Sequence, residues 1–173
     1  DITAADPHKI VEKGLIHVPQ GNQLFPEMTV QENLTLGTFA ARTDKSKASN
    51  FEKVFTLFPR LKERLSQRAQ TLSGGERQML AIGVGLMGMP ELLILDEPSV
   101  GLAPIIKEEL AHAIGEIASS GVTMIVVDQD VELLLGICER LYLIEKGSIS
   151  LETADVSQVD QAEILEMYFG KVT

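Results

Sequence analysis

From Leu72 onward the chain alternates between segments with helical spacing and short apolar runs, and few folds accommodate that order. The apolar runs predict buried strands at 92–95, 122–127 and 140–144, and the segments around them predict helices at 76–87, 104–119 and 131–138. Helical crossovers of this length join parallel strands, and parallel sheets are usually buried under helices. The sequence therefore predicts an α/β fold in which helices cover both faces of a parallel sheet.

The part of the chain before Leu72 is predicted to be mostly helical. The expected elements are a strand at 14–18 ended by Pro19, helices at 33–41 and 45–58 with Pro59 closing the second, and a charged helical face at 60–68. No low-complexity linker or internal repeat interrupts these elements. We therefore expect a single domain over residues 1–173.

Composition and charge limit the functional classes. The 173 residues carry a formal net charge of -10, and sixteen acidic but only four basic residues lie in 91–173, which argues against nucleic-acid binding. The single cysteine, Cys138, permits no internal disulfide, and three scattered histidines do not predict a metal site. No apolar stretch is long enough to span a membrane, and no secretory signal is visible. We expect a cytoplasmic protein that is soluble or peripheral to a membrane.

The start of the sequence is unusual for a complete translation product. The chain begins with Asp1, and its first methionine, Met28, lies in a segment that is expected to be ordered. We therefore expect the sequence to be a fragment or a processed form of a longer chain.

Two adjacent acids follow the apolar run at 92–95. Asp96 and Glu97 would lie at the carboxyl edge of a parallel sheet, where α/β folds bind ligands. There one carboxylate can hold Mg²⁺ through water and the other can polarise an attacking water. The alternative is a strand-to-loop junction whose acids cap the turn. The segment alone leaves both interpretations open.

A serine and two glycines precede the helix predicted at 76–87. Ser73, Gly74 and Gly75 offer a hydroxyl and unobstructed backbone N–H groups to an anion such as phosphate. The same segment also fits a plain helix cap, because Ser73 with Glu76 three residues later is a capping-box pattern. Taken alone, this segment favours the cap.

Together, the two segments have the order and spacing of a known family. The sequence Leu-Ser-Gly-Gly-Glu at 72–76 resembles the signature of the ATP-binding subunits of ABC transporters, and 92–96 resembles their Walker B strand. The resemblance makes Glu97 the catalytic glutamate, Gln20 the Q-loop glutamine that senses Mg²⁺ and the membrane subunit, and 99–103 the D-loop. It implies nucleotide-binding roles for Gln20, Leu72, Ser73, Gly74, Gly75, Glu76, Ser99 and Gly101, and Mg²⁺ ligation by Asp96 and Gln20.

The resemblance extends to a subfamily. Residues 24–34, 57–61 and 98–104 resemble the second ATPase subunit of branched-chain amino acid importers, to which urea and short-amide importers are close. Most ABC ATPases carry a switch histidine where this chain has Gln129, but glutamine also occurs there in the resembled subfamily. Gln129 can hydrogen-bond a γ-phosphate, yet it cannot carry a proton as imidazole can. We expect a catalytic role for Gln129 without proton transfer.

One family motif does not occur in the sequence. A P-loop, Gly-x-x-x-x-Gly-Lys-Ser/Thr, holds phosphates and Mg²⁺, but the one Gly-Lys pair, Gly170-Lys171, is followed by Val172. In the family the P-loop and the first sheet strands precede the segment that resembles 1–3, so apolar surface on the central strands should be uncovered. The resemblance implies a partial ABC-type ATPase domain, with a helical signature subdomain at about 33–88 and core parts at 1–32 and 89–173.

Three functions compete. The resemblance implies an ATPase subunit of an importer, with ATP and Mg²⁺ as cofactors, permease and paralogous ATPase subunits as partners, and a place on the inner face of the cell membrane. The 173 residues alone are expected to be inactive without a P-loop. The alternative is a non-catalytic partner-binding module, because Asp96 and Glu97 without phosphate-holding groups would repel ATP. An ABC-type ATPase of DNA repair or translation is disfavoured by the acidic second half.

Overall fold

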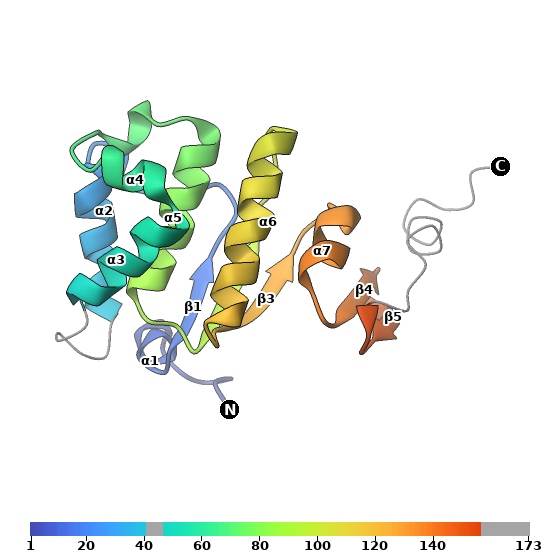
Figure 1. Cartoon of the computed structure of the whole chain (residues 1–173). Helices are drawn as coiled ribbons and strands as arrows, with labels where there is room; N and C mark the ends of the chain where they lie inside the picture. The colour runs from blue at the N-terminus through green and yellow to red at the C-terminus, as the bar shows by residue number, and fades with distance from the viewer. Residues whose placement is uncertain (41–46, 157–173) are drawn as a thin grey trace. The chain divides into compact units, whose positions relative to one another are not determined.

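The computed structural model describes residues 1–40 and 47–156, which fall into two compact units (Figure 1). The first unit is Asp1–Val127, and the second begins at Asp128. The elements of the first unit are α1 (Pro7–Glu12), β1 (Leu15–Val18), α2 (Val30–Gly37), η1 (Thr38–Ala40), α3 (Lys47–Leu57), α4 (Pro59–Glu63), η3 (Ala69–Thr71), α5 (Gly74–Met87), β2 (Leu92–Asp96), α6 (Pro104–Ser119) and β3 (Thr123–Val127).

The first unit contains a three-stranded parallel sheet with the order β1-β2-β3. Val18 pairs with Leu95, and Asp96 pairs with Val127, so the carboxyl ends of all three strands meet at one edge. These findings confirm the α/β fold with a parallel sheet. They also bring the residues that follow β1 and β2 to the same edge.

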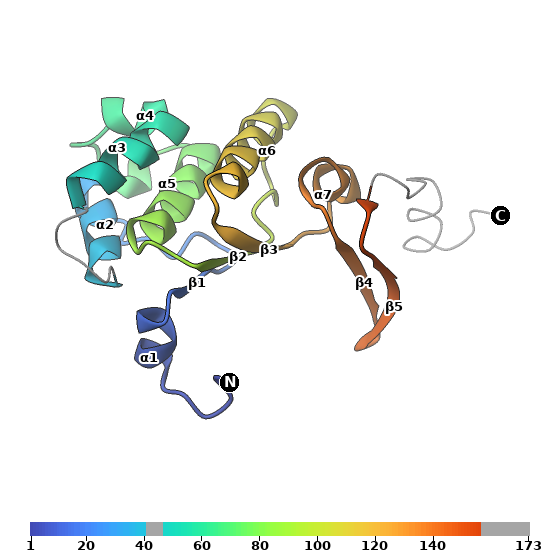
Figure 2. The same cartoon turned by 60° about the horizontal axis from the view of Figure 1, so that its bottom comes forward.

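Helices α5 and α6 cover one face of this sheet (Figure 2). Leu93 and Leu95 point to this face and are fully buried. Gly85 of α5 comes so close that a Cβ there would lie 2.9 Å from Cγ2 of Val18 and 3.3 Å from Cδ1 of Leu93. Tight helix-to-sheet packing therefore forms the core beneath the carboxyl edge.

The opposite face is largely open, which corrects the expectation that helices cover both faces. Ile125 and Val127 lie on this face with 48% and 52% of their surface exposed, and α1 lies on this side (Figure 2). The reason is the strand order β1-β2-β3. Both crossovers, from β1 to β2 and from β2 to β3, move to the next strand in the same direction, and because crossovers are right-handed their helices lie on the same face of the sheet. Uncovered apolar surface on the strands is thus present, as expected.

The segment between β1 and β2 is helical, but its boundaries differ from the predicted ones. Pro59 does close α3, but it also starts α4, which ends at Glu63 rather than continuing to residue 68. The chain leaves the helix because its backbone pairs elsewhere: Val30 N donates to Gln67 O (2.9 Å), and Gln31 N donates to Leu65 O (3.1 Å). This pairing attaches the segment before the signature to the start of α2.

The second unit contains α7 (Val131–Ile137), β4 (Leu141–Glu145) and β5 (Ser148–Thr153). The strand predicted at 140–144 exists as β4, but it pairs antiparallel with β5 and does not join the parallel sheet. The antiparallel pairing with β5 follows from the turn between the two strands, because Lys146 and Gly147 have φ of 48° and 81°, which suit a two-residue hairpin. β5 was not predicted, although its sequence alternates between polar and apolar residues.

Candidate functional site

The carboxyl edge of the sheet brings together three of the predicted site residues. Asp96 ends β2, Glu97 follows it, and Gln20 lies two residues beyond the end of β1. The amide Nε2 of Gln20 donates a hydrogen bond to Oε2 of Glu97 at 2.5 Å, across 77 positions of sequence. His17 Nε2 lies 3.9 Å from Oδ2 of Asp96, with both side chains partly exposed. We call Gln20, Asp96 and Glu97 the strand-edge cluster.

Glu97 adopts a backbone conformation that glutamate rarely takes. Its φ is +46°, in the left-handed region that costs a residue with a Cβ about 1–2 kcal/mol. The main chain holds it there, because Glu97 N donates to Val127 O at 2.7 Å and Val100 N donates to Glu97 O at 3.3 Å. Backbone strain of this kind accumulates at functional sites, where it fixes the direction of a side chain.

The predicted D-loop leads from this cluster into α6. Ser99 is 2% exposed, and Leu102 N donates to Ser99 O at 3.2 Å. Gly101 has a φ of +71°, which glycine adopts without penalty, and Pro104 occupies the first turn of α6. The loop is therefore a defined turn with a buried serine.

The predicted signature forms the start of α5, which begins at Gly74, two residues earlier than predicted. Ser73 is the N-cap, and its capping box with Glu76 is complete: Glu76 N donates to Ser73 Oγ (3.3 Å), and Ser73 N donates to Glu76 Oε2 (2.8 Å). The capping box takes up two of the four N–H groups of the first turn, and those of Gly74 and Gly75 remain. We call residues 72–76 the signature turn.

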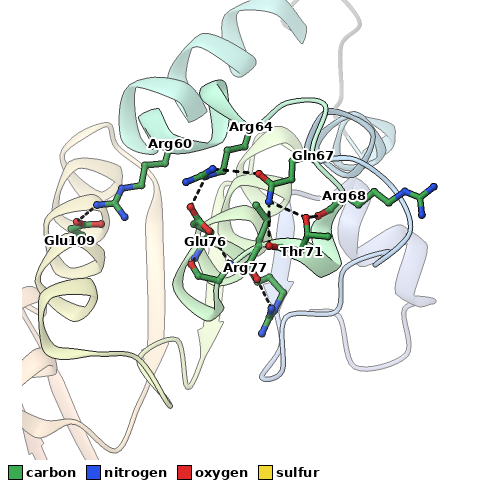
Figure 3. A network of polar contacts seen from close by, with 10 residues as sticks. Arg60, Arg64, Gln67, Arg68, Thr71, Glu76, Arg77 and Glu109 are labelled. Atoms are coloured by element: carbon green, nitrogen blue, oxygen red, sulfur yellow. Dashed lines mark hydrogen bonds and ion pairs between the residues drawn. The ribbon is translucent and has the colours of Figure 1, made fainter.

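Glu76 is buried, with 8% of its surface exposed, and it carries a charge at neutral pH. Burial opposes the charged form, but the backbone N–H and hydroxyl of Ser73 and the guanidinium of Arg64 outweigh it and lower the pKa of Glu76. Arg64 Nε donates to Glu76 Oε1 at 2.6 Å (Figure 3). The turn is thus held by charge-assisted hydrogen bonds.

The signature turn packs against the beginning of α6. A Cβ at Gly75 would lie 2.7 Å from Cγ2 of Ile106, a distance that real Cβ atoms do not tolerate. A Cβ at Gly74 would meet nothing within 4 Å. Gly75 is therefore needed for packing, whereas the space beside Gly74 is open to a ligand.

The strand-edge cluster suits Mg²⁺ by donor chemistry. Carboxylate and amide oxygens are hard ligands, and Mg²⁺ binds through one or two carboxylates together with substrate phosphates and water. Gln20 uses its amide nitrogen for Glu97, so its amide oxygen is on the other side of the group from that contact. Within residues 1–40 and 47–156, no group of three or more His, Cys, Asp or Glu side chains is placed to hold a metal ion. Mg²⁺ at this cluster would therefore need phosphate and water ligands as well.

Gln129 belongs to the second unit, between β3 and α7. In its neighbourhood Asp130 N donates to Asp128 Oδ1 (2.9 Å), and Asp130 Oδ1 accepts from Leu133 N (3.1 Å) as the N-cap of α7. The role expected for Gln129 stays a prediction.

The sequence analysis did not identify two residues whose hydrogen bonds stabilise the loop after Gln20 and the signature turn. Asn33 is 2% exposed; its Nδ2 donates to three carbonyl oxygens, and its Oδ1 accepts from Phe25 N, which fixes the loop after Gln20. The helix predicted at 33–41 placed Asn33 at its first residue, so no signal in the sequence indicated this role. Arg64 was included in a solvated helical face, and nothing in its spacing predicted the bond to Glu76.

Burial raises the pKa of the half-buried Cys138 thiol, which makes the thiol less reactive. Among the helices that the structure describes, none has the length and hydrophobicity of a membrane span.

Comparison with known proteins gives consistent results. The family model described as ABC transporter matches residues 1–100. The branched-chain amino acid transport ATP-binding protein BraG of Pseudomonas aeruginosa is 42% identical over 93% of this chain and 69% of its own length. The probable branched-chain amino acid transport ATP-binding protein LivF of Archaeoglobus fulgidus is 32% identical over 87% of this chain and 64% of its own length.

Solved structures agree with the sequence comparison. A nucleotide-free ATP-binding cassette from an ABC transporter and the ADP conformation of such a cassette each superpose with a TM-score of 0.77 and 26% identity. Each match covers 99% of this chain and 74% of the solved one. The matched residues 1–100 include the strand-edge cluster, the signature turn and Ser99. The chain belongs to the ATP-binding subunit family of ABC transporters.

Proposed function

We propose that the chain is the ATP-binding and ATP-hydrolysing part of an ABC importer subunit for branched-chain amino acids. The observation that carries the proposal is the hydrogen bond between Gln20 and Glu97 beside Asp96, at the edge where parallel strands end. Family membership and the similarity to BraG and LivF support the solute class.

In this proposal the strand-edge cluster performs the hydrolytic chemistry. Glu97 polarises the water that attacks the γ-phosphate, and its strained backbone keeps the carboxylate directed by the hydrogen bond from Gln20. Asp96 and the amide oxygen of Gln20 would hold Mg²⁺, which neutralises charge on the phosphates when bound. Gln129 would contribute a hydrogen bond to the γ-phosphate.

The signature turn binds phosphate across a dimer interface in this proposal. The N–H groups of Gly74 and Gly75 and the hydroxyl of Ser73 close on ATP held by a second, paralogous ATPase subunit, arranged head to tail. Ser99 and Gly101 shape the D-loop beside that interface. The segment of about 33–88 acts as a helical signature subdomain, and 1–32 and 89–173 act as the catalytic core.

Permease subunits are the other partners, so the protein works in the cytoplasm on the inner face of the cell membrane. We further propose that these 173 residues alone do not hydrolyse ATP, because the sequence contains no P-loop to hold the phosphates. Calorimetry with Mg-ATP tests this part, and micromolar binding by the 173 residues would contradict it. Binding to a partner without any effect on ATP turnover would favour a non-catalytic module instead.

The decisive experiment uses a chimera that joins these residues to the P-loop part of a branched-chain relative. Glu97→Gln keeps the shape of the side chain and its acceptor oxygen but cannot polarise water as a carboxylate does. We expect ATP binding to be retained and the hydrolysis rate to fall about 100-fold or more. Glu116→Gln, an exposed glutamate on α6, is the matched control and should hydrolyse ATP normally. Undiminished hydrolysis by Glu97→Gln would refute the assignment.

A further inference from the structure

Arg64 bridges two groups on either side of the signature turn. It follows the last residue of α4, and its Nε donates to Oε1 of Glu76 at 2.6 Å. Its Nη1 lies 3.4 Å from Oε1 of Gln67, whose Nε2 donates to the carbonyl oxygen (3.2 Å) and hydroxyl (2.9 Å) of Thr71. One guanidinium thus contacts residue 76, at the end of the turn, directly, and residue 71, just before the turn, only through Gln67 (Figure 3).

The two carboxylate oxygens of Glu76 accept hydrogen bonds from different donors. Oε2 accepts the backbone N–H of Ser73, and Oε1 accepts Nε of Arg64. Because the carboxylate is buried, loss of the guanidinium would leave it with a charge that only Ser73 compensates. The orientation of Ser73 therefore depends on a side chain that lies 9 positions earlier in the sequence.

The basic residues around Arg64 do not share this arrangement. Arg60 pairs with the partly exposed Glu109 at 3.2 Å, and Arg68 pairs with Glu27 at 3.0 Å with both charged groups largely exposed. Exposed pairs of this kind contribute little. Glu76, by contrast, has 11% of its side chain exposed. Arg64 is thus the arginine of this group whose partner is a buried carboxylate within the signature turn.

We propose that Arg64 is a positioning residue of the signature turn, which acts through Glu76 and Gln67 to hold Ser73, Gly74 and Gly75 in a phosphate-binding conformation. The phosphate-binding role of the turn rests on the proposed function. The dependence of the turn on Arg64 does not, because the contacts lie within the chain itself. Arg64 would not touch the nucleotide.

The test uses nuclear magnetic resonance on the 173-residue chain, with Arg64→Met as the main variant and Arg60→Met as its matched control on the same helix. Methionine retains an apolar stem and removes the guanidinium. In Arg64→Met we expect the pKa of Glu76 to rise, because a favourable positive charge is lost. We also expect the Ser73 amide to exchange its hydrogen about tenfold faster, since its acceptor carboxylate is no longer held. Arg60→Met should change neither quantity.

Two more variants separate positioning from general loss of stability. Arg64→Lys keeps the charge but cannot reach both Glu76 and Gln67, so it should restore most of the Glu76 pKa and little of the Ser73 protection. In a Glu76→Gln background the carboxylate is replaced by a neutral amide, so Arg64→Met should accelerate Ser73 exchange much less than in the wild type. If Arg64→Met does not fold, the lysine variant supplies the same two readouts.

The proposal is overturned if Arg64→Met leaves both the Glu76 pKa and Ser73 exchange unchanged. It is equally overturned if Arg60→Met has the same effects, or if the Glu76→Gln background does not reduce the effect of Arg64→Met. These measurements involve no nucleotide. A failure of the proposed ATPase function would therefore appear only in the calorimetry and hydrolysis experiments, and a failure of Arg64 only here.

Discussion

The strand-edge cluster and the signature turn are two polar regions of the same unit, and they are built in opposite ways. Glu97 is held in a strained backbone conformation, and its carboxylate accepts a hydrogen bond from the amide of Gln20. Glu76 is buried in a relaxed helix cap, and the protein supplies partners for both of its oxygens. The direction of the first carboxylate is fixed by its main chain, whereas the second carboxylate is fixed by contacts to its side-chain oxygens.

This difference separates two ways of preparing a polar group for chemistry. A reactive carboxylate must keep lone pairs for water or a metal, so the protein fixes its direction through the main chain and accepts the strain. A group that only presents N–H donors gains from a rigid support that is fully hydrogen-bonded. Substitutions in the two regions should therefore change stability in opposite directions.

The largest expected effect comes from Glu76→Ala. The substitution removes the capping-box acceptor of Ser73 and leaves Arg64 without its buried partner. We expect the free energy of unfolding to fall by about 2–3 kcal/mol, the cost of breaking a hydrogen bond to a charged group and leaving its partner unsatisfied. Urea denaturation measures it. A loss below about 0.5 kcal/mol, the usual limit for neutral surface changes, would show that the turn is not internally supported.

The next effect distinguishes the two glycines of the turn. Gly75→Ala places a Cβ against Ile106, and we expect it to lower the free energy of unfolding by about 1 kcal/mol or more, as overpacking does. Gly74→Ala is the matched control: it meets open space and should be neutral or slightly stabilising, because alanine favours a helix. Equal effects of the two substitutions in urea denaturation would contradict the close approach of α5 to α6.

The strand-edge cluster should respond in the opposite direction. Glu97→Gly removes a side chain from a position with a φ of +46°, and glycine adopts that conformation freely. We expect the free energy of unfolding to rise by up to about 1 kcal/mol despite the lost bond from Gln20. Thermal unfolding measures it, with Glu97→Ala as the control that loses the same carboxylate but keeps the Cβ. Stability equal to that of the alanine variant would mean that the backbone is not strained.

Sequence patterns predicted the parts of the molecule that depend on local spacing. Helix α6 has the bounds predicted for it, and β2 and the capping box follow from an apolar run and from the spacing of Ser73 and Glu76. The expectation of helices on both faces of the sheet was wrong, because the side on which the crossovers lie depends on strand order. The strand predicted at 140–144 was expected in the parallel sheet, but as β4 it pairs antiparallel with β5 through a two-residue turn.

In the candidate site, too, local sequence patterns predicted adjacent residues but not contacts between distant ones. Asp96 and Glu97 are adjacent in sequence and were easily found, whereas the bond of Gln20 to Glu97 joins residues that are far apart. The motif resemblance assigned both residues to the nucleotide site, but it did not predict the hydrogen bond between them. Arg64 escaped both approaches, because it lies outside the motifs and its partner is fixed by how α4 packs near α5.

The smallest expected effect is a pH dependence that compares the two capping boxes of the chain. Hydrogen bonds from Thr29 lower the pKa of the fully exposed Glu32, whereas Glu76 has a lowered pKa in a buried setting that includes Arg64. For a carboxylate with a lowered folded pKa, the stabilisation is complete above the unfolded pKa of about 4.3 and is lost as the pH falls through the folded pKa. Glu76→Gln should therefore weaken the decline of stability below about pH 4.3, when urea denaturation is repeated at several pH values. Glu32→Gln should weaken it less, because water already screens Glu32. An equal change in both variants would mean that burial and Arg64 do not increase the pH dependence of stability that Glu76 causes. The support of the signature turn would then come from the hydrogen bonds of Ser73 alone.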